Sequence, residues 1–108
     1  MTLSDQEFAN VTKPIETAIG LPNRAYTDDA FLGDEYAQVL GRGWIGIAFE
    51  SDAAQPGDMY PVLAAGQPLL VVRGHDDQIR VFHNVCRHRG ATLLGEPCSK
   101  KATIVCPY

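Results

Sequence analysis

The sequence has little of what marks membrane proteins and nucleic-acid-binding proteins. Its longest apolar runs, WIGIAF and PLLVV, are far shorter than the roughly 18 to 20 residues that a membrane-spanning helix needs. Lys and Arg number 9 against 13 Asp and Glu, so the 108-residue chain has a formal net charge of −4 and no long basic run. We therefore expect neither a membrane nor a nucleic acid as a partner.

The N-terminus also lacks the features of a secretory signal. Residues 1–16, MTLSDQEFANVTKPIE, have neither a basic start nor an apolar centre, so we expect a cytoplasmic protein. Only three cysteines are present. An odd number of cysteines in that compartment is more typical of metal ligands or free thiols than of a disulfide framework.

The first part of the chain has helical signals. SDQE at residues 4–7 is a capping box, in which a serine and a glutamate satisfy backbone groups at a helix start. Pro14 interrupts the helical spacing of apolar residues that follows, so this helix is short or kinked. A second helix is predicted to begin near Thr27 and to end at the glycines from Gly41 onward.

From Trp44 onward the pattern becomes typical of β-strands. Five short runs rich in β-branched and aromatic residues are separated by Gly, Pro and Asp, and they lie at residues 43–50, 58–66, 68–74, 78–85 and 102–108. We expect a mostly β, antiparallel domain over residues 44–108 with a helical N-terminal segment over residues 1–43. Trp44 is expected to pack in the core, and His83 is expected to face the core or to pack beneath the loop that follows it. His75 is expected to be solvated in a hairpin turn.

Cys86, His88 and Cys106 are the candidate metal ligands. Because one residue separates Cys86 from His88, both side chains can approach one centre from an extended loop. The C-x-x-C and H-x(3 to 5)-H spacings of a mononuclear zinc site are absent. The pattern favours ligands that reach two adjacent metal ions, although a three-ligand zinc site or two buried thiols beside a polar loop histidine remain as alternatives.

A family resemblance extends beyond these ligands. CRHRG, whose histidine is followed after 17 residues by CPY, closely resembles the motif C-x-H-x(15 to 17)-C-x-x-H of Rieske [2Fe-2S] centres, in the form found in α-subunits of Rieske-type ring-hydroxylating oxygenases. LPNRAYTDDAF, GRGWIGIAF and PGDMYPV look like the N-terminal lead of those subunits, so the resemblance covers most of the chain from about Leu21 onward.

The resemblance implies a ligand set. Cys86 and Cys106 would bind one iron of a [2Fe-2S] cluster, while His88 and a second histidine would bind the other iron. The family pattern places that second histidine directly after Tyr108, beyond the last residue of this sequence. With three of four ligands, the 108-residue chain alone is expected to be inactive and to form an unstable cluster.

Other positions refine the resemblance. Gly90 would let backbone amides approach a bridging sulfide, while Arg87 and Arg89 would offset cluster charge or face an acidic partner. Rieske proteins of respiratory complexes carry two extra, disulfide-forming cysteines at the positions of Ala91 and Tyr108. Their absence here favours the oxygenase type or a soluble Rieske ferredoxin. Cys98 is out of register with the motif, and we expect it to serve packing.

The implied function is electron transfer within a larger enzyme. A reductase or ferredoxin would deliver electrons drawn from NAD(P)H, and a mononuclear non-haem Fe(II), present only in the full-length protein, would activate O2. Such subunits commonly form homo-trimers or hetero-hexamers. No residue of the chain is predicted to be catalytic itself. The alternatives are a stand-alone Rieske ferredoxin, against which the helical preface of about 40 residues counts, and an apo-fragment without independent activity.

Overall fold

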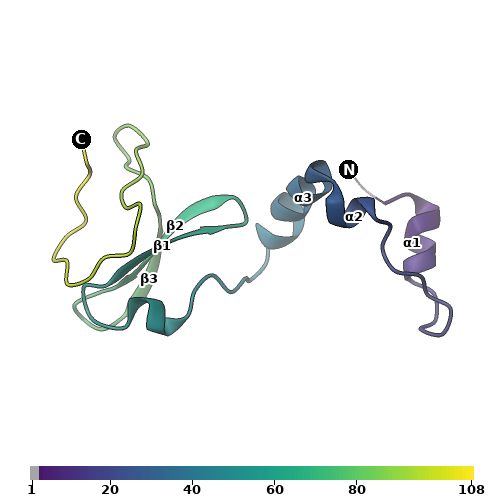
Figure 1. The fold of residues 1–108 in the computed structure, drawn as a ribbon, viewed down its shortest axis with the longest axis horizontal. Helices are drawn as coiled ribbons and strands as arrows, with labels where there is room; N and C mark the ends of the chain where they lie inside the picture. Colours follow the sequence, from purple (N-terminus) through teal and green to yellow (C-terminus); the bar gives the residue numbers. More distant parts are fainter. Residues whose placement is uncertain (1–2) are drawn as a thin grey trace. The chain divides into compact units, whose positions relative to one another are not determined.

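The computed structural model describes residues 3–108, which divide into two compact units (Figure 1). One unit extends to Ile45 and is helical, whereas the other, Gly46–Tyr108, contains the strands. We describe each unit by itself. No helix in the described range is long and apolar enough to cross a membrane.

The first helix, α1 (Asp5–Val11), begins at the predicted capping box. The backbone N–H of Ser4 donates to the Glu7 carboxylate at 2.8 Å, and the N–H of Glu7 donates to the Ser4 hydroxyl at 3.3 Å. Arg24 Nη2 donates to the same carboxylate at 2.7 Å. Hydrogen bonds from Arg24, and then from Ser4, lower the pKa of Glu7 to about 2, so the carboxylate ties α1 to the next helix in its charged form.

The second helical stretch consists of α2 (Arg24–Thr27), α3 (Asp29–Glu35) and a π-helical turn, η1 (Tyr36–Leu40). Asp28 caps α3 by accepting from the N–H of Ala30 at 2.8 Å, which confirms a helix start in this region. Gly41 ends the stretch, where its N–H donates to the carbonyl of Tyr36 at 2.7 Å. A Cβ at this position would lie 2.6 Å from that oxygen, so the backbone can close only on a glycine.

The second unit is built on one antiparallel sheet in the order β1 (Met59–Ala64), β2 (Gln67–Arg73) and β3 (Ile79–His83). Ala65 and Gly66, at φ values of 48° and 75°, form the tight turn between β1 and β2. The predicted hairpin turn between β2 and β3 is confirmed, and His75 within it is exposed. The hydrophobic core is small and consists of Ala53, Met59, Leu70 and Val71.

Arg73 is the polar centre of this unit. Its side chain is only 8% exposed, and its Nε donates to the carbonyl of Ala53 at 2.6 Å. The two terminal nitrogens reach the carboxylates of Glu50 at 3.2 Å and Asp77 at 3.1 Å. One guanidinium thus joins the end of β2, the following turn and the 3-10 helix η2 (Glu50–Ala53), and its burial is offset by these charge-assisted bonds.

Two of the five predicted strands are wrong. In the segment 43–50, the N–H of Phe49 donates to the Asp52 carboxylate at 2.8 Å, and this bond starts η2 instead of a strand. Residues 102–108 form no strand because the chain leaves the sheet after Lys101, whose N–H donates to Gly57 at 3.0 Å. A strand needs a continuous backbone partner, and neither segment has one among residues 3–108.

The expected burial of Trp44 and His83 is also wrong. Trp44 is fully exposed in its unit. His83 belongs to β3, and all five residues of this edge strand are exposed because no other described segment covers it. Apolar alternation therefore predicted the strand correctly but did not predict which residues become buried.

Candidate metal centre

The first ligand loop, residues 86–91, folds back on itself shortly after β3. The N–H of Cys86 donates to the carbonyl of Ala91 at 2.7 Å, and the N–H of Gly90 donates to the carbonyl of Cys86 at 2.8 Å. Gly90 has a φ of 71°, a left-handed conformation that costs a residue with a Cβ about 1–2 kcal/mol. The left-handed turn thus explains why a glycine occupies this position. The expected approach of backbone amides near Gly90 to a bridging sulfide stays a prediction.

Cys86 and Cys106 come from different segments, yet their side chains are in hydrogen-bonding contact. The pKa of the Cys86 thiol is lowered, first by the backbone N–H of His88, then by the Cys106 side chain and by the N–H of Arg89. Both thiols are free and half-buried. Because the thiolate is the form that binds metal, the loop favours the ligating state of Cys86.

The residues directly after Cys86 are accessible. Arg87, His88 and Arg89 are all exposed, so the imidazole and both guanidinium groups are accessible at the surface. An open hollow of about 380 Å³ lies beside them, lined by Arg89, Gly90, Ala91 and Tyr108. The first ligand loop and the C-terminal residue thus border the same space.

The three predicted ligands do not surround a single point. Within residues 3–108, no three His, Cys, Asp or Glu side chains form a group that could hold one metal ion. In a two-iron centre the thiolates and the imidazoles bind different irons, so no such group is needed. A pair of thiols in contact, with backbone N–H groups directed at one sulfur, fits the thiolate side of that centre.

Asn84 is a residue of this region whose role we did not predict. It is 3% exposed, and its side chain both donates to the carbonyl of Leu94 at 2.7 Å and accepts from the N–H of Leu94 at 3.0 Å. Its position, at the end of a strand and two residues before a predicted ligand cysteine, was the available signal. An asparagine there can pair with a neighbouring backbone as a strand would.

The segment that leads to Cys106 is held at the other side of the sheet. Cys98 and Met59 exchange backbone hydrogen bonds of 2.8 and 3.0 Å, which form an isolated antiparallel bridge. The Asp58 carboxylate accepts from the N–H of Gln55 at 2.9 Å and also from Ser99 and the N–H of Lys100, and these bonds lower the pKa of Asp58. Cys98 is therefore fixed by its backbone on the β1 edge of the sheet.

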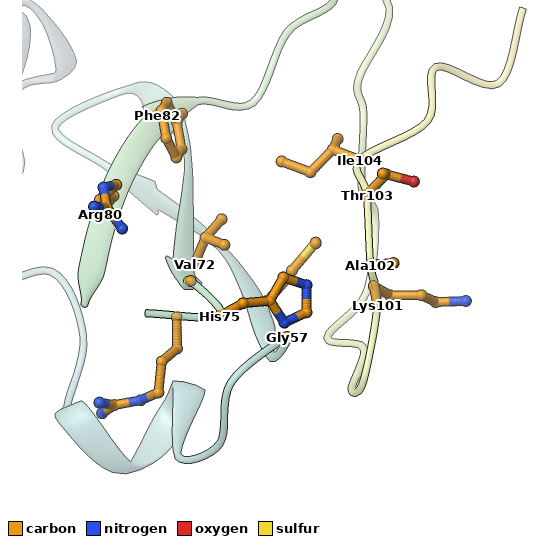
Figure 2. A pocket seen from close by; sticks show the side chains of 12 residues that line it. Gly57, Val72, His75, Arg80, Phe82, Lys101, Ala102, Thr103 and Ile104 are labelled. Atoms are coloured by element: carbon orange, nitrogen blue, oxygen red, sulfur yellow. The ribbon is translucent and has the colours of Figure 1, made fainter. Parts of the chain in front are cut away.

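A second hollow, of about 270 Å³, lies between the sheet and the segment that follows Lys101 (Figure 2). Phe82 borders it from β3 and Ile104 from the opposite side, as Figure 2 shows. None of the three candidate ligands lines it. This mainly apolar space separates the sheet from the chain that runs to Cys106.

Comparison with known families places this geometry in context. Residues 43–108, more than half of the chain, match the family described as the Rieske [2Fe-2S] domain. That match confirms the predicted cofactor class.

Curated relatives are subunits of oxygenases. The carnitine monooxygenase oxygenase subunit of Acinetobacter baumannii is 34% identical over 93 residues, and that of Escherichia coli K12 is 38% identical over 88 residues. The glycine betaine monooxygenase oxygenase subunit of Chromohalobacter salexigens is 34% identical over 88 residues. These alignments cover 86%, 82% and 82% of this chain but only 25%, 24% and 20% of the relatives, so the chain spans a quarter or less of their length.

Solved structures give the same result. A quaternary ammonium Rieske monooxygenase in complex with gamma-butyrobetaine aligns with 100% of this chain and 30% of its own, at a TM-score of 0.78 and 32% identity. Naphthalene 1,2-dioxygenase from Rhodococcus sp. aligns with 82% of this chain and 20% of its own, at a TM-score of 0.72 and 27% identity. The predicted fold class is confirmed, and the chain belongs to the Rieske [2Fe-2S] domain family, with similarity to the corresponding part of Rieske oxygenase subunits.

Proposed function

We propose that this chain is the electron-relay portion of a Rieske non-haem iron oxygenase α-subunit. In this proposal, residues 44–108 form the cluster domain and residues 1–43 form its helical lead. Cys86 and Cys106 hold one iron of the [2Fe-2S] cluster, and His88 holds the other. The fourth ligand is a histidine that follows Tyr108 in the full-length protein.

The observation that carries the proposal is the contact between the Cys86 and Cys106 side chains. Nineteen residues lie between them in the sequence, yet the loop after β3 and the C-terminal segment bring the two thiols together. A two-iron cluster needs two thiolates on the same iron. The exposure of His88 supports its assignment to the other, more accessible iron.

When bound, the cluster supplies a centre that accepts and passes on one electron at a time. The chain's own residues provide its ligands and its electrostatic surroundings. The N–H groups of His88 and Arg89 stabilise negative charge on the Cys86 sulfur, which raises the potential of such a centre. Oxygen chemistry belongs to a mononuclear iron elsewhere in the full-length protein.

The electron donor is proposed to be a reductase or ferredoxin with an acidic docking surface. Arg87 and Arg89 are exposed beside His88, and neither has an ion pair among residues 3–108. They form a local positive patch on a chain whose formal net charge is −4. A positive patch next to the exposed imidazole would steer an acidic donor to the cluster. The cytoplasmic location stays a prediction.

The proposed substrate of the full-length enzyme is a quaternary ammonium compound, with an aromatic ring as the second candidate. The structural match covers 100% of this chain for the quaternary ammonium monooxygenase and 82% for naphthalene 1,2-dioxygenase from Rhodococcus sp.. One related structure is described in terms of inter-subunit electron transfer. That finding supports an assembly in which the cluster of one chain serves the iron of another, and we propose that this assembly is a homo-trimer or hetero-hexamer.

Iron-sulfur reconstitution of two lengths of the protein tests the proposal. We expect the 108-residue chain to give an unstable product and the full-length protein to give a Rieske-type EPR signal after reduction. The full-length protein should also consume O2 in the presence of NAD(P)H, its reductase and a quaternary ammonium substrate. A stable Rieske cluster on the 108-residue chain would show that the fourth ligand is not the histidine proposed here.

A further inference from the structure

We propose that Asn84 is a positioning residue for the cluster, because it sets the conformation of the first ligand loop through a side-chain clamp on Leu94. The inference rests on the function proposed above. It concerns a residue that is not itself a ligand.

Asn84 is fixed on the sheet side by its backbone. Its N–H donates to the carbonyl of Pro68 at 2.8 Å, which continues the ladder between β2 and β3 by one more bond. The residue is 3% exposed and lies two positions before Cys86. Its main chain therefore belongs to the sheet. Only one residue lies between it and Cys86, so Cys86 can move little relative to the sheet.

The side chain of Asn84 closes the loop at its far end. Both polar atoms of the amide are used, since Nδ2 donates to the Leu94 carbonyl at 2.7 Å and Oδ1 accepts from the Leu94 N–H at 3.0 Å. This arrangement replaces a β-bridge across a separation of ten residues in the sequence. Alanine would leave the half-buried N–H and carbonyl of Leu94 without partners, so the loop is expected to open and hydrate them.

The clamp matters for the metal centre because the loop that it encloses carries two of the proposed ligands. Residues 85–93 contain Cys86, His88 and the two backbone N–H groups that face the Cys86 sulfur. These N–H groups keep their direction only while the loop keeps its shape. Hydrogen bonds to a ligand sulfur stabilise the more negative, reduced cluster, so an opened loop lowers the reduction potential.

The experiment compares Asn84→Ala with Asn84→Asp, and it uses two independent measurements. The first is hydrogen exchange of the Leu94 amide in the cluster-free protein, where we expect exchange roughly tenfold faster or more in Asn84→Ala. The second is the reduction potential and EPR line shape of the loaded full-length protein. We expect a lower potential and altered g-values in Asn84→Ala, with partial recovery in Asn84→Asp, which keeps the acceptor for the Leu94 N–H.

Thr92→Ala is the matched control. Thr92 lies in the same loop, is exposed and makes no side-chain hydrogen bond in the described chain, so both measurements should stay at wild-type values. If Asn84→Ala accelerates exchange at Leu94 but leaves the potential and the g-values unchanged, Asn84 is only structural and the inference is wrong. Unchanged exchange at Leu94 would contradict the clamp itself. A wild-type protein without a Rieske signal would instead overturn the proposed function. The exchange data from the cluster-free protein would still show whether Asn84 holds Leu94.

Discussion

The three cysteines of the chain differ in their surroundings and not in their exposure. All three are half-buried and free, but only Cys86 and Cys106 are in contact, and only Cys86 receives backbone N–H groups on its sulfur. Cys98 is held by backbone bonds to Met59. The reactivity of each cysteine depends on the groups that face its sulfur. Spacing in the sequence predicted such an environment only for the two motif cysteines.

Serine substitutions test this difference. Cys86→Ser and Cys106→Ser are expected to remove the cluster, because a hydroxyl at neutral pH does not replace a thiolate on iron. The measurement is iron and acid-labile sulfide per chain in the full-length protein, together with visible absorbance. Cys98→Ser is the matched control and should retain wild-type cluster content. Loss of the cluster in the control, with retention in Cys86→Ser, would reverse our assignment.

Glu7 predicts a pH dependence in the helical unit. Its pKa in the folded chain is about 2, below the value of about 4.3 for an unperturbed glutamate, so its charged form stabilises the fold above that unperturbed value. This stabilisation is lost as the pH falls from about 5 toward 2.

Hydrogen-exchange protection of amides that donate to α1 carbonyls, such as the amide of Thr12, which bonds to Phe8, measures the effect. Protection should fall over this pH range in the wild type, whereas Glu7→Gln should show low protection at all pH values and little pH dependence. Glu16→Gln, at an exposed site, serves as the control and should follow the wild type. Identical pH profiles for Glu7→Gln and the wild type would refute the role of this carboxylate.

At the scale of elements, the sequence predicted the pieces that depend on local signals. The capping box at Ser4, the helix end at Gly41 and the β2–β3 turn were all correct, because each depends on a few neighbouring residues. Two strands were wrong, since strand formation requires a partner that local apolar content does not reveal. The clamp of Asn84 on Leu94 was missed for the same reason, because its partner lies ten residues away.

Arg73 tests how the elements of the second unit are joined. Lysine keeps the charge but cannot replace the several directed bonds that Arg73 makes to Ala53, Asp77 and Glu50. We expect Arg73→Lys to lower the melting temperature by roughly 5 °C or more. Arg80→Lys is the control, because Arg80 is exposed and pairs only with Asp76 in the described structure, and its melting temperature should change little. Equal shifts in the two variants would contradict the joining role of Arg73.

At the scale of the whole molecule, the loop around His88 is positively charged although the chain as a whole is negatively charged. The formal net charge is −4, yet the exposed loop around His88 carries Arg87 and Arg89. An acidic electron donor would therefore be attracted to this loop and repelled by much of the remaining surface. Such steering acts on the rate of association and weakens as salt is added.

Charge reversal at this loop tests the docking proposal. Arg87→Glu and Arg89→Glu should slow electron transfer from the reductase by roughly tenfold at low ionic strength, and they should also weaken its salt dependence. Arg42→Glu makes the same change in the helical unit and is expected to leave the rate near the wild-type value. Stopped-flow reduction of the full-length protein gives the rates. A donor that reduces all three variants equally fast would show that it docks elsewhere.

The central claim is that two thiolates and two imidazoles hold a [2Fe-2S] cluster, with Cys86, Cys106 and His88 as three of the four ligands. Its most direct test is ENDOR spectroscopy of the reduced full-length protein labelled with ¹⁵N-histidine, alone and with the His88→Ala substitution. We predict nitrogen couplings from two histidines in the labelled wild type, and loss of the Rieske signal in the variant. A reduced cluster without histidine nitrogen coupling, or a Rieske signal that survives His88→Ala, would contradict the account.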